Sequence, residues 1–144
     1  MADDPAVLTP DDRARLRIIA ETLPMLESPE FTAGVWHDSE RMADGKLSMP
    51  WFELSSEAEV FTRAVGEAGL LQVGFAWPDW AGTPEAGALR TDRQALARAT
   101  PDQLGKLLTM LIREDRFSEG ALAASFESGL IAAIARRARA LSDA

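Results

Sequence analysis

The C-terminal third of the chain reads, from Pro101 to Leu141, PDQLGKLLTMLIREDRFSEGALAASFESGLIAAIARRARAL. Leucines recur every three or four residues in its first half, and alanine, leucine and isoleucine do so in its second half. This spacing is typical of helices that bury one apolar face. We therefore predict two helices, over residues 101–116 and 119–141, that fold back on each other as a helical hairpin.

Glu127 does not fit this apolar pattern. It is the only charged residue between Gly120 and Ala135, and helical spacing places it on the apolar face of the second helix. A carboxylate on a buried face must be paired, hydrogen-bonded or protonated. We predict that Glu127 is buried and that its partner comes from outside the helical hairpin: a cation, a tryptophan N–H or a helix N-terminus.

A second carboxylate, Asp115, continues the leucine stripe of the first helix. It lies near the C-terminus of that helix, where the helix dipole disfavours an acid. We therefore expect a specific partner, either Arg116 or the backbone N–H groups of the next helix. Two interpretations of Asp115 and Glu127 stay open: they are structural ion pairs or caps, or they line a functional pocket with a guiding arginine.

The middle of the chain predicts a small antiparallel β-hairpin. Strand-like runs at residues 35–37 and 49–54 flank the turn-prone sequence Ala43-Asp44-Gly45-Lys46. Residues 70–77 are a candidate third strand. Residues 78–87 are rich in proline and glycine and are predicted to form a loop.

Cap signals predict the remaining helices. Thr9-Pro10 is a helix start, and Pro24 is expected to end that helix. Ser56 begins a capping box, and its helix is expected to end at Gly69. A short helix is expected over residues 93–99.

Together these elements predict a mainly α fold, on the border of α+β. It has about five helices, a C-terminal helical hairpin and a small antiparallel β-hairpin in the middle. Residues 9–144 are expected to form a single globular domain, and residues 1–8 a disordered tail.

Composition excludes several kinds of active site. The 144 residues include no cysteine, no tyrosine and one histidine, which excludes thiolate nucleophiles and Cys-ligated metals. The glycine-rich phosphate loops, the nucleophile elbow and the zinc-binding helix motif are missing as well. We therefore expect no metal and no cofactor. His37 lies in a polar, turn-like run and is interpreted as a solvated loop residue.

The chain is acidic, with a net charge of −8. Such a chain repels phosphate backbones and anionic membrane surfaces, so we expect neither nucleic acid nor a membrane as partner. No apolar run is long enough to span a bilayer, and the N-terminal residues lack the pattern of a signal peptide. The expected location is the cytoplasm.

All four tryptophans lie between Trp36 and Trp80. Clustered aromatic residues either line ligand pockets or cover a small sheet as part of the core. Trp77 and Trp80 flank a proline in the predicted loop, so we expect them to form an exposed rim or a mobile lid.

The C-terminal block resembles a bacterial family known only as a domain of unknown function. The resemblance rests on Arg113–Gly120, Phe126–Ile131 and Arg136-Arg137, with looser support from Met49–Ser55 and Phe75–Trp80. It implies a standalone bacterial domain, and it suggests that Asp115, Arg116, Glu119 and Glu127 belong to one constellation. No activity comes with it.

Three hypotheses about function follow. The preferred one is a non-catalytic module that binds a protein or a small molecule, through Arg116, Glu119, Trp51, Trp77 and Trp80. The alternative is a small hydrolase or lyase in which Glu127 or Asp115 acts as general base and Arg116 orients an anionic substrate. The third is a homodimer in which the apolar stripe of the last helix packs on its mate and Glu127 pairs across the axis.

Overall fold

The computed structural model describes residues 8–144, and it is about 58% helical with one two-stranded antiparallel sheet. The elements are α1 (Pro10–Ala20), α2 (Leu23–Leu26), β1 (Gly34–His37), β2 (Trp51–Leu54), α3 (Ser56–Ala68), α4 (Trp77–Ala81), α5 (Pro84–Thr91), α6 (Arg93–Leu96), α7 (Pro101–Glu114), α8 (Ala121–Glu127) and α9 (Leu130–Asp143). The mainly α fold with a small β-hairpin is confirmed. The helices are more numerous than the roughly five expected, because several are single turns.

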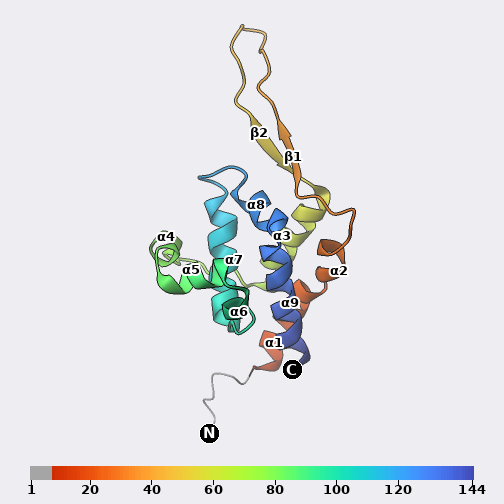
Figure 1. Cartoon of the computed structure of the whole chain (residues 1–144), viewed down its shortest axis with the longest axis vertical. Helices are drawn as coiled ribbons and strands as arrows, with labels where there is room; N and C mark the ends of the chain where they lie inside the picture. Colours follow the sequence, from red (N-terminus) through yellow and green to blue (C-terminus); the bar gives the residue numbers. More distant parts are fainter. Residues whose placement is uncertain (1–7) are drawn as a thin grey trace.

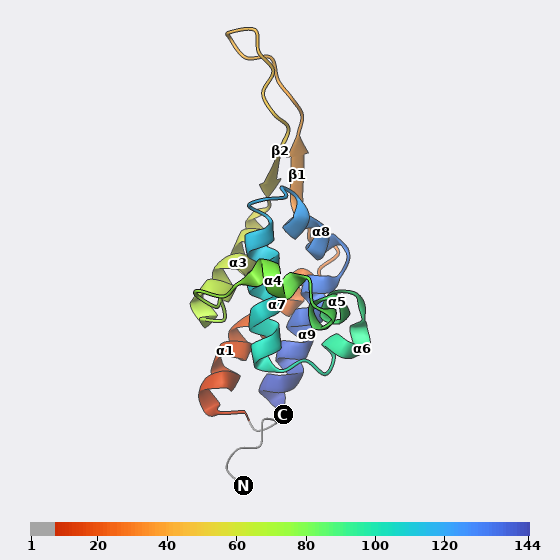
Figure 2. The same cartoon turned by 90° about the vertical axis from the view of Figure 1, so that its left-hand side faces the viewer.

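One hydrophobic core joins the helices (Figures 1 and 2). α1 packs against α9 and α3, while α7 contacts α4, α5, α8 and α9. Leu16, Phe61, Leu107 and Ile134 are fully buried in this core, and each such side chain contributes about 1.5–3 kcal/mol by leaving water. The tail expected over residues 1–8 lies outside the described residues, except for Leu8, which packs on the core.

The helix start at Thr9 and the helix end at Gly69 are where the sequence predicted them, whereas two other boundaries differ. Thr9 and Thr100 each form a complete capping box at the start of α1 and α7. The cap of α3 is Ser55, one residue earlier than predicted, because its hydroxyl accepts from the amide of Ala58. Pro24 does not end the first helix; it lies in the first turn of α2, a position that needs no N–H donor.

The predicted helix over residues 119–141 is wrong. Gly129 has φ 85° and ends α8, since a left-handed glycine turns the chain out of helical geometry. α9 then begins at Leu130. Its apolar stripe, including Ile131 and Ile134, is buried inside this chain, so the stripe is not available to pack on a second copy as the homodimer hypothesis required.

Two predictions about the middle of the chain are also wrong. Residues 70–77 form no strand, so the sheet has only β1 and β2 in the described part of the chain. Residues 78–87 are not a plain loop, because α4 and α5 occupy most of that segment. Pro78 and Pro84 fall in the first turns of these helices, where proline favours a helix start.

The β-hairpin projects away from the helices (Figures 1 and 2). β1 and β2 pair with Trp36 opposite Phe52, and an isolated bridge between Arg41 and Leu47 continues the pairing toward the tip. We call residues 34–54 the arm.

Candidate functional site

Glu127 is exposed to solvent, so the prediction that it is buried is wrong. It is the last residue of α8, just before the break at Gly129. Among the described residues its side chain has no hydrogen-bond or ion-pair partner. A buried general base therefore has no support at this position.

Asp115 was expected to pair either with Arg116 or with backbone N–H groups of the next helix, and it pairs with the backbone N–H groups. Its Oδ1 accepts hydrogen bonds from the amides of Gly120 and Leu122, at 3.2 and 3.1 Å. The carboxylate thereby closes the turn between α7 and α8 and satisfies amides that the start of α8 would otherwise leave free. Arg116 is exposed and does not pair with Asp115.

The turn that Asp115 closes is also the support of the arm. The amide of Phe52 donates a 2.7 Å hydrogen bond to Glu119 Oε1. Trp36 lies over Gly120 so closely that a Cβ there would be 2.6 Å from its Cζ2 atom. Glu119, predicted as a binding residue, holds the base of the arm.

The opposite face of the arm carries the only histidine. His37 Nε2 lies 2.7 Å from Glu53 Oε1, and its ring stacks on Trp51 with 4.3 Å between centroids and 17° between planes. His37 is thus the last residue of a strand and does not lie in a loop as predicted, while its side chain stays 38% exposed.

Most of the exposed large hydrophobic side chains lie on the arm. Of the nine in the described part of the chain, six lie between residues 34 and 54: Val35, Trp36, Met42, Leu47, Met49 and Trp51. Met49 is 81% exposed. Isolated exposed apolar residues are ordinary, but a concentration of them on one projecting element is not.

Sequence reasoning found Trp51 but missed Met42, Leu47 and Met49. Leu47, Met49 and Trp51 recur at every second residue, which is a strand period. The sequence does not show that no part of the fold covers these side chains.

The expected tryptophan rim does not form. Trp80 is 8% exposed, and its Nε1 donates a 3.2 Å hydrogen bond to Glu85. Trp77 is half-buried and its ring lies 6.0 Å from that of Phe117, which is 81% exposed. The proline between the tryptophans begins a helix, so the segment folds onto the body.

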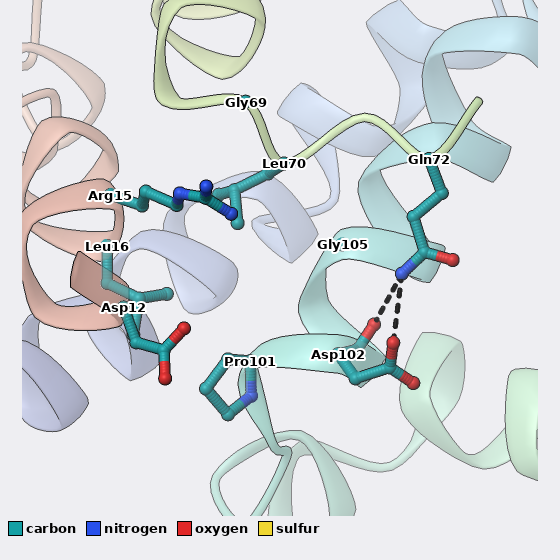
Figure 3. A pocket seen from close by; sticks show the side chains of 9 residues that line it. All are labelled: Asp12, Arg15, Leu16, Gly69, Leu70, Gln72, Pro101, Asp102 and Gly105. Atoms are coloured by element: carbon teal, nitrogen blue, oxygen red, sulfur yellow. Dashed lines mark hydrogen bonds between the residues drawn. The ribbon is translucent and has the colours of Figure 1, made fainter. Parts of the chain in front are cut away.

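Figure 3 shows a pocket of about 280 Å³ between α1, the segment after α3, and the start of α7. Its polar groups already have partners: Gln72 Nε2 donates to the backbone and side chain of Asp102, at 3.4 and 3.1 Å. Asp102 also pairs with Lys106, and Arg15 pairs with Asp11. None of the predicted site residues lines this pocket, and its paired groups leave little to recognise a ligand.

No group of three or more His, Asp or Glu side chains in residues 8–144 is placed to hold a metal ion. No helix within the described residues is long and apolar enough to cross a membrane.

A search of curated proteins and a search of solved structures each gave no match. A family model does match, over residues 12–144. That match includes both strands of the arm and all of the described helices, apart from the first two residues of α1. The chain belongs to this family, described as a family of unknown function, DUF6508.

Proposed function

We propose that this chain is a non-catalytic module that binds another protein through the arm. One observation carries the proposal: of the nine exposed large hydrophobic side chains among residues 8–144, six lie on this projecting hairpin. Leaving such side chains in water stabilises nothing in the fold, whereas covering them with a partner yields roughly 25 cal/mol per Å² of apolar surface.

The arm offers a partner backbone groups as well as side chains. Within the described residues its sheet has only two strands, so each strand has one edge without a neighbouring strand there. Glu119 covers the edge of β2 at Phe52. The outer edge of β1 has no strand beside it in the described residues, and an extended segment of a partner can pair there.

Charge defines the partner further. Residues 34–54 hold four acids and two bases, a net charge of −2, and the whole chain carries −8. We expect an apolar groove with a lysine or arginine rim, because opposite charge speeds encounter and selects the partner. A second copy of this chain is a poor match, since two molecules of −8 repel each other.

The test uses the triple variant Met42→Ser, Leu47→Ser, Met49→Ser and a matched control, Val73→Ser. Val73 is 95% exposed but lies on the body, outside the arm. The unaltered chain is used to capture a protein from cells that encode it, and the captured protein is identified and purified separately. It is then titrated against the unaltered chain, the arm variant and Val73→Ser. The arm variant should bind at least about tenfold more weakly, a loss of about 1.4 kcal/mol, and Val73→Ser should bind normally.

Two results contradict the proposal. One is a purified partner that binds the arm variant as tightly as the unaltered chain. The other is sedimentation showing a dimer of the unaltered chain that the arm variant abolishes, which would make a second copy the occupant.

A further inference from the structure

A second pocket, distinct from the arm, lies where α6 packs against α9. Its volume is about 390 Å³, within the range of small-molecule sites. Four of its residues are apolar and three are arginines, and no acid lines it: Leu96, Ala97, Ala133, Ala140, Arg93, Arg136 and Arg137. An apolar wall with a cationic rim is unusual on a chain of net charge −8.

Among residues 8–144, only one of the three arginines has a carboxylate partner. Arg136 donates to Glu27 Oε2 from Nε and Nη2, at 3.1 and 2.9 Å. Arg93 and Arg137 have no carboxylate within 4.0 Å among residues 8–144. They bond instead to backbone carbonyls, which carry no net charge, so within the described structure these two positive charges have no paired carboxylate.

The bonds from these arginines to backbone carbonyls give them a structural role, but the bonds use only some of the guanidinium N–H donors. Arg137 Nε donates to the carbonyl of Ala99 at 2.8 Å, and Arg93 Nη2 donates to that of Ser128 at 3.2 Å. Both carbonyls follow the last turn of a short helix, where a cation is favourable. In the described structure Nη1 and Nη2 of Arg137 have no protein acceptor.

Arg137 is therefore oriented in advance of any ligand. The bond from Nε fixes the plane of the guanidinium and leaves its two terminal nitrogens for an acceptor. Burial also lowers the pKa of Arg137, because desolvation disfavours its charged form. An anion placed there recovers part of that lost solvation, and a carboxylate matches the geometry of two parallel N–H donors.

We infer that this pocket binds a small organic carboxylate with a short apolar chain. The carboxylate bonds to the terminal nitrogens of Arg137, Arg93 adds a second positive charge, and the apolar chain covers Ala97 and Ala133. The volume is too small for a long polyanion, which the charge of the chain would also repel. This inference does not depend on the proposed role of the arm.

The probe is hexanoate, compared with hexanol and hexylamine, in calorimetric titrations of the full chain. Hexanoate should bind saturably and at least about tenfold more tightly than either analogue, a difference of about 1.4 kcal/mol. Arg137→Gln should weaken hexanoate binding at least about tenfold and Arg93→Gln by a smaller factor. Arg63→Gln, an exposed arginine on α3, is the control and should bind normally.

Arg137→Gln also loses the bond to Ala99, so a second variant guards against misfolding. Ala140 is exposed and lines the pocket, and Ala140→Trp should block binding while leaving the arginines and the core intact. The inference is overturned if hexanol binds as tightly as hexanoate, if Ala140→Trp binds normally, or if Arg63→Gln weakens binding as much as Arg137→Gln. Lack of saturation at about 10 mM hexanoate also overturns it, because such affinity is below that of a specific site.

Discussion

The backbone amide of Phe52 donates a 2.7 Å hydrogen bond to the carboxylate of Glu119. The bond joins the second strand of the arm to the turn between α7 and α8, two segments that are distant in the sequence. That turn is closed in its own right by Asp115. The arm therefore has a fixed base, while its apolar tip extends into solvent (Figure 2).

Glu119→Ala should loosen the base of the arm. Exchange of the Phe52 amide should become faster, while global stability falls by no more than about 1 kcal/mol, because the bond is exposed. Hydrogen exchange with mass spectrometry measures the first effect and urea unfolding the second. Glu119→Gln keeps an acceptor, so its Phe52 amide should exchange at a rate between those of the unaltered chain and Glu119→Ala. Unchanged exchange in Glu119→Ala would show that the bond does not hold the arm.

Asp115→Ala should cost about 0.5–2 kcal/mol in urea unfolding, since it removes the acceptor for two amides at the start of α8. Asp115→Asn retains an acceptor and should lose less. The matched control is Glu127→Ala, which should stay within about 0.5 kcal/mol of the unaltered chain because its side chain is exposed and unpaired in the described structure. A large loss in Glu127→Ala would mean that this carboxylate is buried after all.

Gly120→Ala and Gly129→Ala separate backbone strain from a steric clash. Both glycines have positive φ, 92° and 85°, so each substitution should cost about 1–2 kcal/mol in conformational strain. Only at Gly120 would the added Cβ also meet the Trp36 ring, at 2.6 Å. Gly120→Ala should therefore be the more destabilising of the two and should alone change the fluorescence of the arm, whereas equal losses and unchanged fluorescence would place Trp36 elsewhere.

The sequence predicted α7 and the arm because local signals and burial agree there. Thr100-Pro101 caps the helix, and its leucine stripe faces the core. The prediction that Glu127 is buried failed because it assumed one continuous helix over residues 119–141. A glycine inside an apolar helical pattern is compatible with a continuous helix, and only the tertiary fold selects the left-handed conformation of Gly129 that breaks it.

The candidate sites were harder to predict than the helices. Asp115 was recognised because an acid at a helix C-terminus needs a partner, and the nearby amides provide one. Arg93 and Arg137 line one pocket only because α6 packs on α9, and no spacing in the sequence encodes that packing. Residues 78–87 were predicted to be a loop because proline is common in loops, but here their prolines lie in the first turns of helices.

The most direct test of the arm as a binding element is urea unfolding of the variant Met42→Ser, Leu47→Ser, Met49→Ser. If these exposed side chains serve a partner and not the fold, its free energy of unfolding should equal that of the unaltered chain within about 0.5 kcal/mol. A loss of more than about 2 kcal/mol, of the kind seen when buried side chains are removed, would show that the tip packs on the body in solution and would contradict the account.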